Sequence, residues 1–160
     1  MAIKEGDKIP SGTVTMMTGE GPKPVSTDDL FKGKKVVVFA VPGAFTPTCS
    51  AKHLPGFVEK AQEIKAKGIN TIACIAVNDA FVMDAWGKSQ NTAGKVDMLA
   101  DGSSKFTDAL GLGMDLTDRG LGKRSRRYSM IVDNGVVTKL NLEEGGAFQV
   151  SDAQTILKQL

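Results

Sequence analysis

The 160-residue sequence contains only two cysteines and one histidine, which limits the metal and disulfide chemistry that it can support. A structural zinc site takes four soft ligands, and a disulfide-stabilised domain needs several cysteine pairs. We therefore expect no bound metal or haem. The two cysteines, Cys49 and Cys74, are either buried core residues or the site of redox chemistry in a reducing compartment.

Long apolar runs and an excess of one charge are also missing. The longest apolar run, Val36 to Val41, has the length of a strand and is far shorter than the about 18 residues of a membrane helix. The net charge of +2 is too small to predict binding to nucleic acid or to an anionic membrane. Residues 1–8 mix both charges and lack the apolar core of a secretory signal, so we expect a cytoplasmic protein.

The apolar pattern predicts a single domain over residues 1–160, without internal repeats or linkers. Strands or extended segments are expected at residues 13–17, 35–41, 70–77 and 96–100. Helical segments are expected at residues 26–29, 50–67, 79–86 and 104–110, the third fraying near Ser89. Gly68 and Gly111 follow two of these helices as predicted C-terminal caps.

The last third of the sequence contains the strongest hairpin signal. Asn134-Gly135 separates two strand-like segments, residues 127–132 and 136–141, and suits a tight turn with positive φ. Residues 111–126 are rich in Gly and charge and predict an ordered surface loop. Ser151 is expected to cap a final helix that turns Ile156, Leu157 and Leu160 inward. The order βαβαβα followed by ββα predicts an α/β fold, a mixed central sheet with helices on both faces.

The segment from Pro42 to Cys49 occupies the turn between the first buried strand and the long helix, where reactive groups gather in such sheets. Cys49 would meet free backbone N–H groups and the positive end of the helix dipole, which favour its thiolate. Pro42 and Pro47 stiffen the loop. Pro55 cannot donate a hydrogen bond to Ala51, which predicts a kink and local unwinding of the turn that carries the sulfur.

Two polar residues are candidates to assist Cys49. The hydroxyl of Thr46, three residues earlier, can donate to the sulfur and accept from an incoming oxygen. Arg127 begins a strand of the expected sheet, and a guanidinium there would stabilise a thiolate and a leaving oxygen. It belongs to the basic cluster of residues 123–127, which is equally typical of a solvated loop, so geometry must decide its role.

Pro42, Thr46 and Cys49 fill the Pro-x-x-x-Thr-x-x-Cys signature of peroxiredoxins. Residues 42–57 resemble the type II branch in particular, also called atypical two-cysteine or peroxiredoxin-5-like, and residues 73–82 and 127–130 match two further stretches of it. The resemblance runs over nearly the whole chain. It implies a thioredoxin-like fold and a cofactor-free thiol peroxidase that is usually a homodimer.

The resemblance also implies a role for each candidate. Cys49 is similar to the peroxidatic cysteine, which attacks a hydroperoxide and becomes a sulfenic acid. Thr46, Arg127 and the N–H of Cys49 resemble the groups that orient the peroxide, and Pro42 resembles the residue that packs over the sulfur. Only the resemblance selects Arg127 within its cluster, and Arg126 is the reserve. It further places two aromatic residues, Phe45 and Phe81, near a dimer contact.

The second cysteine is where this sequence departs from part of the family. Some type II members resolve the sulfenic acid with a cysteine near the C-terminus, but residues 144–151 contain none, which excludes that disulfide. Plant-like members have a cysteine at the position of Cys74. A site about three residues inside a buried strand lies roughly 10 Å from Cys49, beyond the ~7 Å that a disulfide spans, so Cys74 is better explained as a core residue. We expect external reduction, by glutathione with glutaredoxin first and by thioredoxin second.

Three other interpretations remain open at this stage. His53, four residues after Cys49, could form a Cys–His dyad, although a packing role is favoured. The protein could be a binding or holdase module in which the thiol is only a redox switch. A thiol transferase is less favoured, because Cys49 has no partner in a C-x-x-C arrangement.

Overall fold

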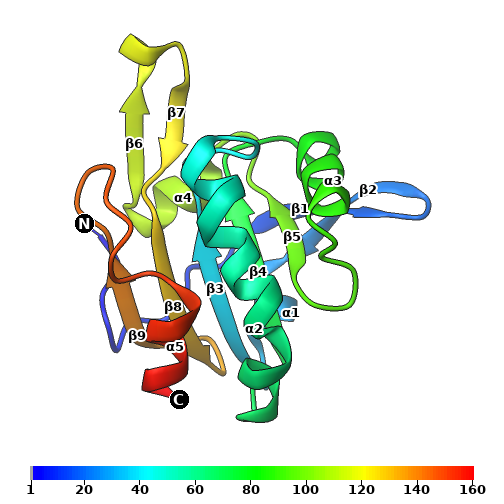
Figure 1. The fold of residues 1–160 in the computed structure, drawn as a ribbon, viewed down its shortest axis with the longest axis vertical. Coiled ribbons are helices and arrows are strands. Elements are labelled where there is room, and N and C mark those ends of the chain that lie inside the picture. Colours follow the sequence, from blue (N-terminus) through cyan, green and yellow to red (C-terminus); the bar gives the residue numbers. More distant parts are fainter. Residues whose placement is uncertain (1) are drawn as a thin grey trace.

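The structure, a computed structural model, describes residues 2–160 and is built around a seven-stranded sheet (Figure 1). Its order is β2-β1-β5-β4-β3-β8-β9. The strands are β1 (Thr13–Thr18), β2 (Gly21–Ser26), β3 (Lys35–Ala40), β4 (Thr71–Ala76), β5 (Asp97–Ala100), β8 (Tyr128–Asp133) and β9 (Val136–Leu142). Strands β3, β4 and β5 are parallel, while β1 and β8 flank them in antiparallel orientation. The predicted mixed sheet is confirmed.

Helices cover both faces of this sheet, as the sequence predicts. They are α1 (Thr27–Phe31), α2 (Leu54–Ala66), α3 (Ala80–Ser89), α4 (Lys105–Leu110) and α5 (Ala153–Gln159). Helices α2, α3 and α5 pack with Val37 and Phe39 of β3, whereas α1 and α4 pack with its alternate residues, Val36 and Val38. A strand buried on both faces explains the continuous apolar run from residue 36 to 41. Within residues 2–160 no helix is long and apolar enough to cross a membrane.

The loop expected at residues 111–126 is instead a hairpin, so this prediction is wrong. Strand β6 (Gly113–Leu116), a 3-10 turn (Thr117–Arg119) and β7 (Gly122–Ser125) extend away from the sheet (Figure 1). Gly120 and Gly122, with φ of 72° and 65°, permit the reversal.

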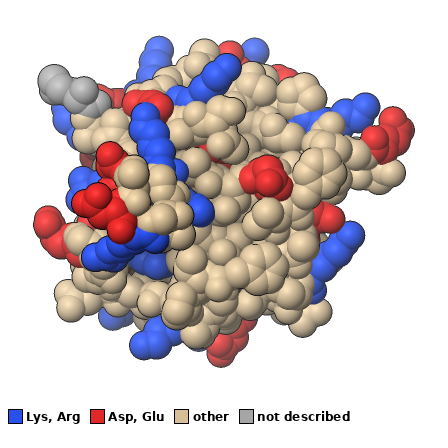
Figure 2. Space-filling model, turned by 90° about the horizontal axis from the view of Figure 1, so that it is seen from above, with Lys and Arg blue, Asp and Glu red and all other residues tan. Residues whose placement is uncertain are grey.

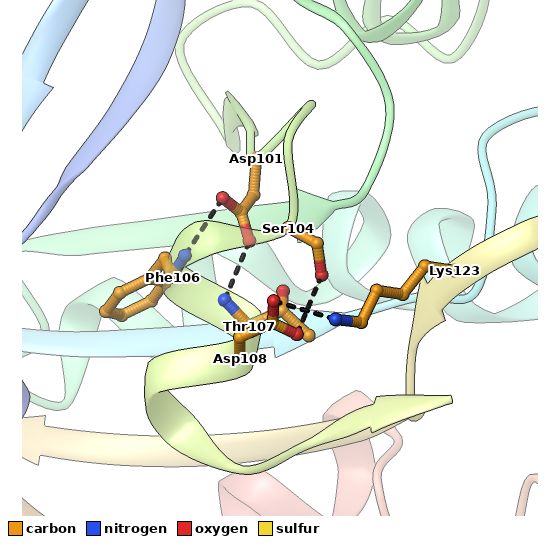
Figure 3. A network of polar contacts seen from close by, with 6 residues as sticks. All are labelled: Asp101, Ser104, Phe106, Thr107, Asp108 and Lys123. Carbon is orange, nitrogen blue, oxygen red and sulfur yellow. Dashed lines mark hydrogen bonds and ion pairs between the residues drawn. The ribbon is translucent and has the colours of Figure 1, made fainter. Parts of the chain in front are cut away.

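A contact with α4 holds strand β7 of this hairpin (Figure 3). Lys123 of β7 forms an ion pair of 2.9 Å with Asp108, which also accepts a hydrogen bond from Ser104. The start of α4 is in turn held by Asp101, whose carboxylate accepts from the backbone amides of Phe106 and Thr107. The hairpin is therefore anchored to the body of the domain.

Helix caps agree with the sequence except at the last helix. Asp79 caps α3 by accepting from Val82 N at 2.8 Å, as expected. The N-cap position of α5 is Asp152 and not Ser151, and its side chain makes no capping hydrogen bond; the Ser151 hydroxyl donates to Glu143 at 2.7 Å. Ile156 and Leu157 of α5 are buried, and Leu160 is partly buried against the same cluster.

Candidate active site

Cys49 lies at the start of an irregular helix beyond the C-terminal end of β3. The first helical hydrogen bond runs from Ser50 N to Thr46 O at 2.9 Å, so the amide of Cys49 is among those left free at the helix start. Residues Cys49–His53 form a π-helical turn, which Leu54 N closes by donating to Cys49 O. The irregularity that Pro55 predicts is thus present as a π-helical turn just before it.

Helix α3 and the loop after β4 hold this turn in place. Trp86 is fully buried, and its Nε1 donates to the Ser50 hydroxyl at 3.0 Å. Gln90 Nε2 donates to Ser50 O at 3.1 Å, and Ala44 N donates to Asn78 Oδ1 at 2.9 Å. The residues on both sides of the sulfur are therefore fixed by neighbouring elements.

A guanidinium contacts the sulfur directly. Arg127 Nη2 donates to Cys49 Sγ at 3.1 Å, and both side chains are buried. The pairing of Ala40 with Tyr128 brings the residue before β8 beside the end of β3, which explains this contact across 78 residues of sequence. Arg126, the reserve candidate, instead donates to Glu143 O at 3.1 Å. A hydrogen bond from a cation stabilises a thiolate more than a thiol.

His53 contacts Arg127 and makes no hydrogen bond with Cys49 in the part of the chain that the structure describes. Arg127 Nη1 lies 2.8 Å from His53 Nδ1, and His53 Nε2 lies 2.9 Å from Ser151 O. Burial, with the charge of Arg127, lowers the pKa of His53 from 6.5 to about 3. The imidazole is therefore neutral at physiological pH, with Nε2–H donating to the carbonyl and Nδ1 accepting from the guanidinium. This arrangement supports the packing interpretation over the Cys–His dyad.

Thr46 and Pro42 lie in the loop before the sulfur. The Thr46 hydroxyl donates to Gly43 O at 2.7 Å rather than to the sulfur, which leaves its lone pairs able to accept from a ligand. Pro42 O accepts from Arg124 Nη1 at 3.4 Å. A Cβ at Gly43 would lie 2.9 Å from Arg124 Nη1 and 3.2 Å from Thr46 Cγ2, so a side chain there would require these two residues to shift. The β6–β7 hairpin thus contacts the loop that carries two of the expected site residues.

Cys74 is the fourth residue of β4 and pairs in register with Phe39. It is fully buried in the same cluster as Cys49, and neither cysteine is in a disulfide. Burial raises the pKa of the Cys74 thiol well above 9.0, and the nearby Cys49 raises it further. A buried neutral thiol fits the prediction of a core residue.

Several residues around the site carry no signal in the sequence. Glu143 accepts hydrogen bonds through Oε2 from the amides of residues 149–151 and from the Ser151 hydroxyl. The Phe148 ring lies 4.9 Å from the His53 ring and 5.8 Å from Arg127 Cζ. The loop of residues 144–151 attracts notice in the sequence only for its lack of cysteine. Its contacts depend on pairing between distant segments.

Comparisons with known proteins agree with this geometry. Residues 4–157 match the family model described as Redoxin. Peroxiredoxin-2E, chloroplastic, from Arabidopsis thaliana is 54% identical over 99% of this chain and 70% of its own length. Peroxiredoxin-2B from the same plant is 51% identical over 99% of this chain and 98% of its own.

A solved structure also resembles this chain along nearly its whole length. The crystal structure of reduced Prx3 from Vibrio vulnificus in complex with hydrogen peroxide has a TM-score of 0.94 and 55% identity, covering 98% of each chain. The holdase interpretation has no support among these matches. The chain belongs to the peroxiredoxin family of thiol-dependent peroxidases, in its type II or peroxiredoxin-5-like branch, and has the thioredoxin-like fold of that family.

Proposed function

We propose that this thiol-dependent peroxidase reduces hydrogen peroxide and alkyl hydroperoxides at Cys49. The contact that carries the proposal is the hydrogen bond of 3.1 Å from the buried Arg127 guanidinium to Cys49 Sγ. A fixed cation beside the sulfur stabilises the thiolate before the reaction and the negative charge that moves to oxygen during it. The free amide of Cys49 and the acceptor lone pairs of Thr46 are available to orient the peroxide.

The reaction follows from these groups. The Cys49 thiolate attacks the terminal peroxide oxygen, the O–O bond breaks, and sulfur loses two electrons to become a sulfenic acid. The electron pair leaves on the second oxygen, which takes up a proton and departs as water or an alcohol. In this scheme Arg127 donates to the departing oxygen, while Pro42 limits access to the sulfur.

Intact-mass analysis after one equivalent of peroxide tests this assignment. Oxidation should add the mass of one oxygen to the wild type and to Cys74→Ser, and a reagent specific for sulfenic acids should form an adduct with both. It should be missing from Cys49→Ser. A trapped product that persists in Cys49→Ser would contradict the assignment.

We further propose that external thiols recycle the enzyme, glutathione with glutaredoxin before thioredoxin. Glutathione would condense with the sulfenic acid to give a mixed disulfide and water, and a second thiol would release Cys49 as a thiol. Two observations support this. The loop of residues 144–151 has no cysteine, and Cys74 is fully buried. Cys49 is also fully buried, so its turn must open to meet a thiol as large as glutathione.

The two reductants are separated by steady-state turnover. Peroxide consumption is measured with glutathione and glutaredoxin, and separately with thioredoxin and its reductase. Sustained turnover with the first system is expected. A single turnover with both systems would instead favour a redox switch, and sustained turnover with thioredoxin alone would reverse the order of the two reductants.

We also propose a homodimer formed through the face that carries Phe45 and Phe81. Their side chains are 57% and 66% exposed, and Phe45 is held at a positive φ of 65°, unusual for a bulky residue. Viewed from above, this end of the molecule is mainly uncharged, apart from one acidic group near its centre, between the charged β6–β7 hairpin and the charged turn that joins β1 to β2 (Figure 2). Exposed aromatic residues on a surface with few charges favour association.

Light scattering after size exclusion tests the dimer. Phe81→Glu is expected to give a monomer at micromolar concentration. Val150→Glu is the matched control, because Val150 is also an exposed apolar residue, at 41%, but lies in the loop before α5 and not in α3. A wild type that is monomeric at high concentration, or a Phe81→Glu variant that stays dimeric, would contradict this interface. The expected cytoplasmic location stays a prediction.

A further inference from the structure

Arg127 is a buried cation whose charge no carboxylate balances directly. Its side chain is 6% exposed, and within residues 2–160 no Asp or Glu forms an ion pair with it. A buried guanidinium needs hydrogen-bond partners to compensate for lost water. Those partners are the Cys49 sulfur and His53. The position of Arg127 at the sulfur therefore depends on His53.

His53 can hold Arg127 only in one orientation and one tautomer. Nδ1 must be unprotonated to accept from Nη1 of Arg127, which requires the proton on Nε2. The carbonyl of Ser151 selects this form by accepting from Nε2 at 2.9 Å. The ring also packs against Phe39 and Phe148, with centroids 5.0 Å and 4.9 Å away. The carbonyl of Ser151 is thus the polar contact that fixes the imidazole.

Ser151 is placed by one carboxylate. Glu143 Oε2 accepts from the amides of Gln149, Val150 and Ser151 at 2.8 Å each, and from the Ser151 hydroxyl at 2.7 Å. Burial alone would raise the pKa of Glu143, but these hydrogen bonds lower it, and the net shift is downward. The side chain is thus a buried carboxylate around which the loop before α5 folds.

The backbone also links Glu143 to the site. Glu143 N donates to Arg127 O at 3.0 Å, one residue beyond the pairing of Tyr128 with Leu142. Glu143 thus lies at the end of the β8–β9 hairpin, opposite the arginine that contacts the sulfur. Its carboxylate accepts hydrogen bonds from the loop and, within residues 2–160, forms no ion pair with Arg127, so we take its effect on the guanidinium to pass through Ser151 and His53.

We propose that Glu143 is a positioning residue for the peroxidase reaction, acting through Ser151 and His53 to hold Arg127 against the Cys49 sulfur. The inference rests on the proposed roles of Cys49 and Arg127. Without the negative charge, as in Glu143→Gln, the amides of residues 149–151 and the Ser151 hydroxyl share only a neutral amide oxygen, a weaker acceptor, and the Ser151 carbonyl is less firmly fixed. His53 is then free to change ring orientation or tautomer, and Arg127 loses one of its two side-chain partners.

The test compares Glu143→Gln with Glu144→Gln, an exposed neighbour that serves as the matched control. The first readout is the second-order rate with peroxide, expected to fall about ten- to hundredfold in Glu143→Gln. The second is the pH midpoint of Cys49 alkylation by iodoacetamide, expected to rise. Glu144→Gln should leave both unchanged.

The third readout is independent of activity. His53 is the only histidine in the chain, so ¹⁵N spectra of labelled protein report a single imidazole. The wild type should show a neutral ring protonated at Nε2, and Glu143→Gln a mixture of tautomers. If Glu143→Gln slows peroxide reduction while the imidazole spectrum and the alkylation midpoint stay as in the wild type, Glu143 is only structural and the proposal fails.

Ser151→Ala covers the case in which Glu143→Gln does not fold. It removes one of the four donors to Glu143 but keeps the carbonyl that contacts His53. A smaller change of the imidazole spectrum in the same direction is expected, and no change would overturn the proposal. Failure of the proposed function looks different: peroxide would then leave wild-type Cys49 unoxidised, whatever the His53 spectrum.

Discussion

Arg127 Nη1 and His53 Nδ1 lie 2.8 Å apart, so the one nitrogen of His53 with a free lone pair is occupied by the guanidinium. The other nitrogen is bound to Ser151 O. With both positions taken and its pKa lowered to about 3, His53 cannot accept a proton from Cys49 near neutral pH. The contact instead orients Arg127, whose second terminal nitrogen reaches the sulfur.

The lowered pKa of His53 predicts how the free energy of unfolding depends on pH. Between pH 6.5 and about 3 the unfolded chain binds a proton at His53 that the folded chain does not bind, so the free energy of unfolding falls as the pH falls. The contribution of the neutral His53 to the free energy of unfolding is fully present above pH 6.5. Between pH 7.5 and pH 5.5 the loss should be about 1.4 kcal/mol for this one group. Urea unfolding at the two pH values measures it.

His53→Gln is the control for that slope. A glutamine amide can accept from Arg127 and donate to Ser151 O but does not titrate. The variant is expected to lose about 1.4 kcal/mol less than the wild type between the two pH values. Equal losses in both proteins would mean that other groups, not His53, set the pH dependence.

Replacement of Arg127 should impair the reaction with peroxide. Arg127→Lys keeps a charge but cannot contact His53 and Cys49 together, since a lysine has one ammonium group in place of a planar fork. The second-order rate with hydrogen peroxide is expected to fall about 10²- to 10³-fold, the usual cost of one donor to a developing oxyanion. Stopped-flow fluorescence of the single Trp86 can follow oxidation.

Arg126→Lys decides between the two arginines. Its guanidinium donates to a backbone carbonyl, Glu143 O, and does not contact the sulfur. The rate with peroxide should stay within about threefold of the wild type, well inside the effect of one misplaced group. A larger loss in Arg126→Lys than in Arg127→Lys would reverse the assignment.

Most of the fold can be predicted because its signals are local. The apolar run of residues 36–41, the Asn134-Gly135 turn and the Asp79 cap each depend on a few neighbouring residues. The two elements that the sequence does not reveal are hairpins. Strand β2 contains Pro22 and Pro24, which are tolerated only because it is an edge strand. The β6–β7 hairpin depends partly on the distant contact between Lys123 and Asp108.

The candidate site likewise has one part that can be predicted from the sequence and one part that cannot. Pro42, Thr46 and Cys49 lie within eight residues, so their grouping can be read from the sequence. Arg127 is 78 residues from Cys49, and only the register of β3 with β8 brings it to the sulfur. Glu143 and Ser151 reach the site through hydrogen bonds to a loop of irregular backbone, for which no sequence periodicity exists.

Cys74 is expected to be dispensable for turnover. Cys74→Ala removes a buried thiol and should lower the free energy of unfolding by about 1 kcal/mol. Peroxide turnover with glutathione and glutaredoxin should stay within about twofold, because no charged or hydrogen-bonding group of the site is changed. Loss of two hydrogens in the wild type on oxidation, missing from a folded but inactive Cys74→Ala, would instead establish an internal disulfide.

Gly43→Ala should disturb the loop that carries Thr46. The new Cβ would lie 2.9 Å from Arg124 Nη1 and 3.2 Å from Thr46 Cγ2, so one of them must move. We expect the rate with peroxide to fall about tenfold, because Thr46 is displaced from its hydrogen bond to Gly43 O. Adding Arg124→Ala opens space on one side and should recover part of the rate. If Gly43→Ala alone reacts as fast as the wild type, the loop is more tolerant than its packing indicates.

Oxidation should loosen the turn that carries the sulfur. In the proposed reaction a Cys49 thiolate balances the buried charge of Arg127, whereas the sulfenic acid that it becomes is neutral and does not. The π-helical turn is separated from the rest of α2 by Pro55, which has no amide to donate. Amide hydrogen exchange at residues 49–54 should therefore become about tenfold faster on oxidation, while residues 57–64 stay protected.

Cys49→Ser, treated with the same peroxide, should show no such change. Equal protection of the two segments in both redox states would rule out the opening and leave the access of glutathione to Cys49 without a route.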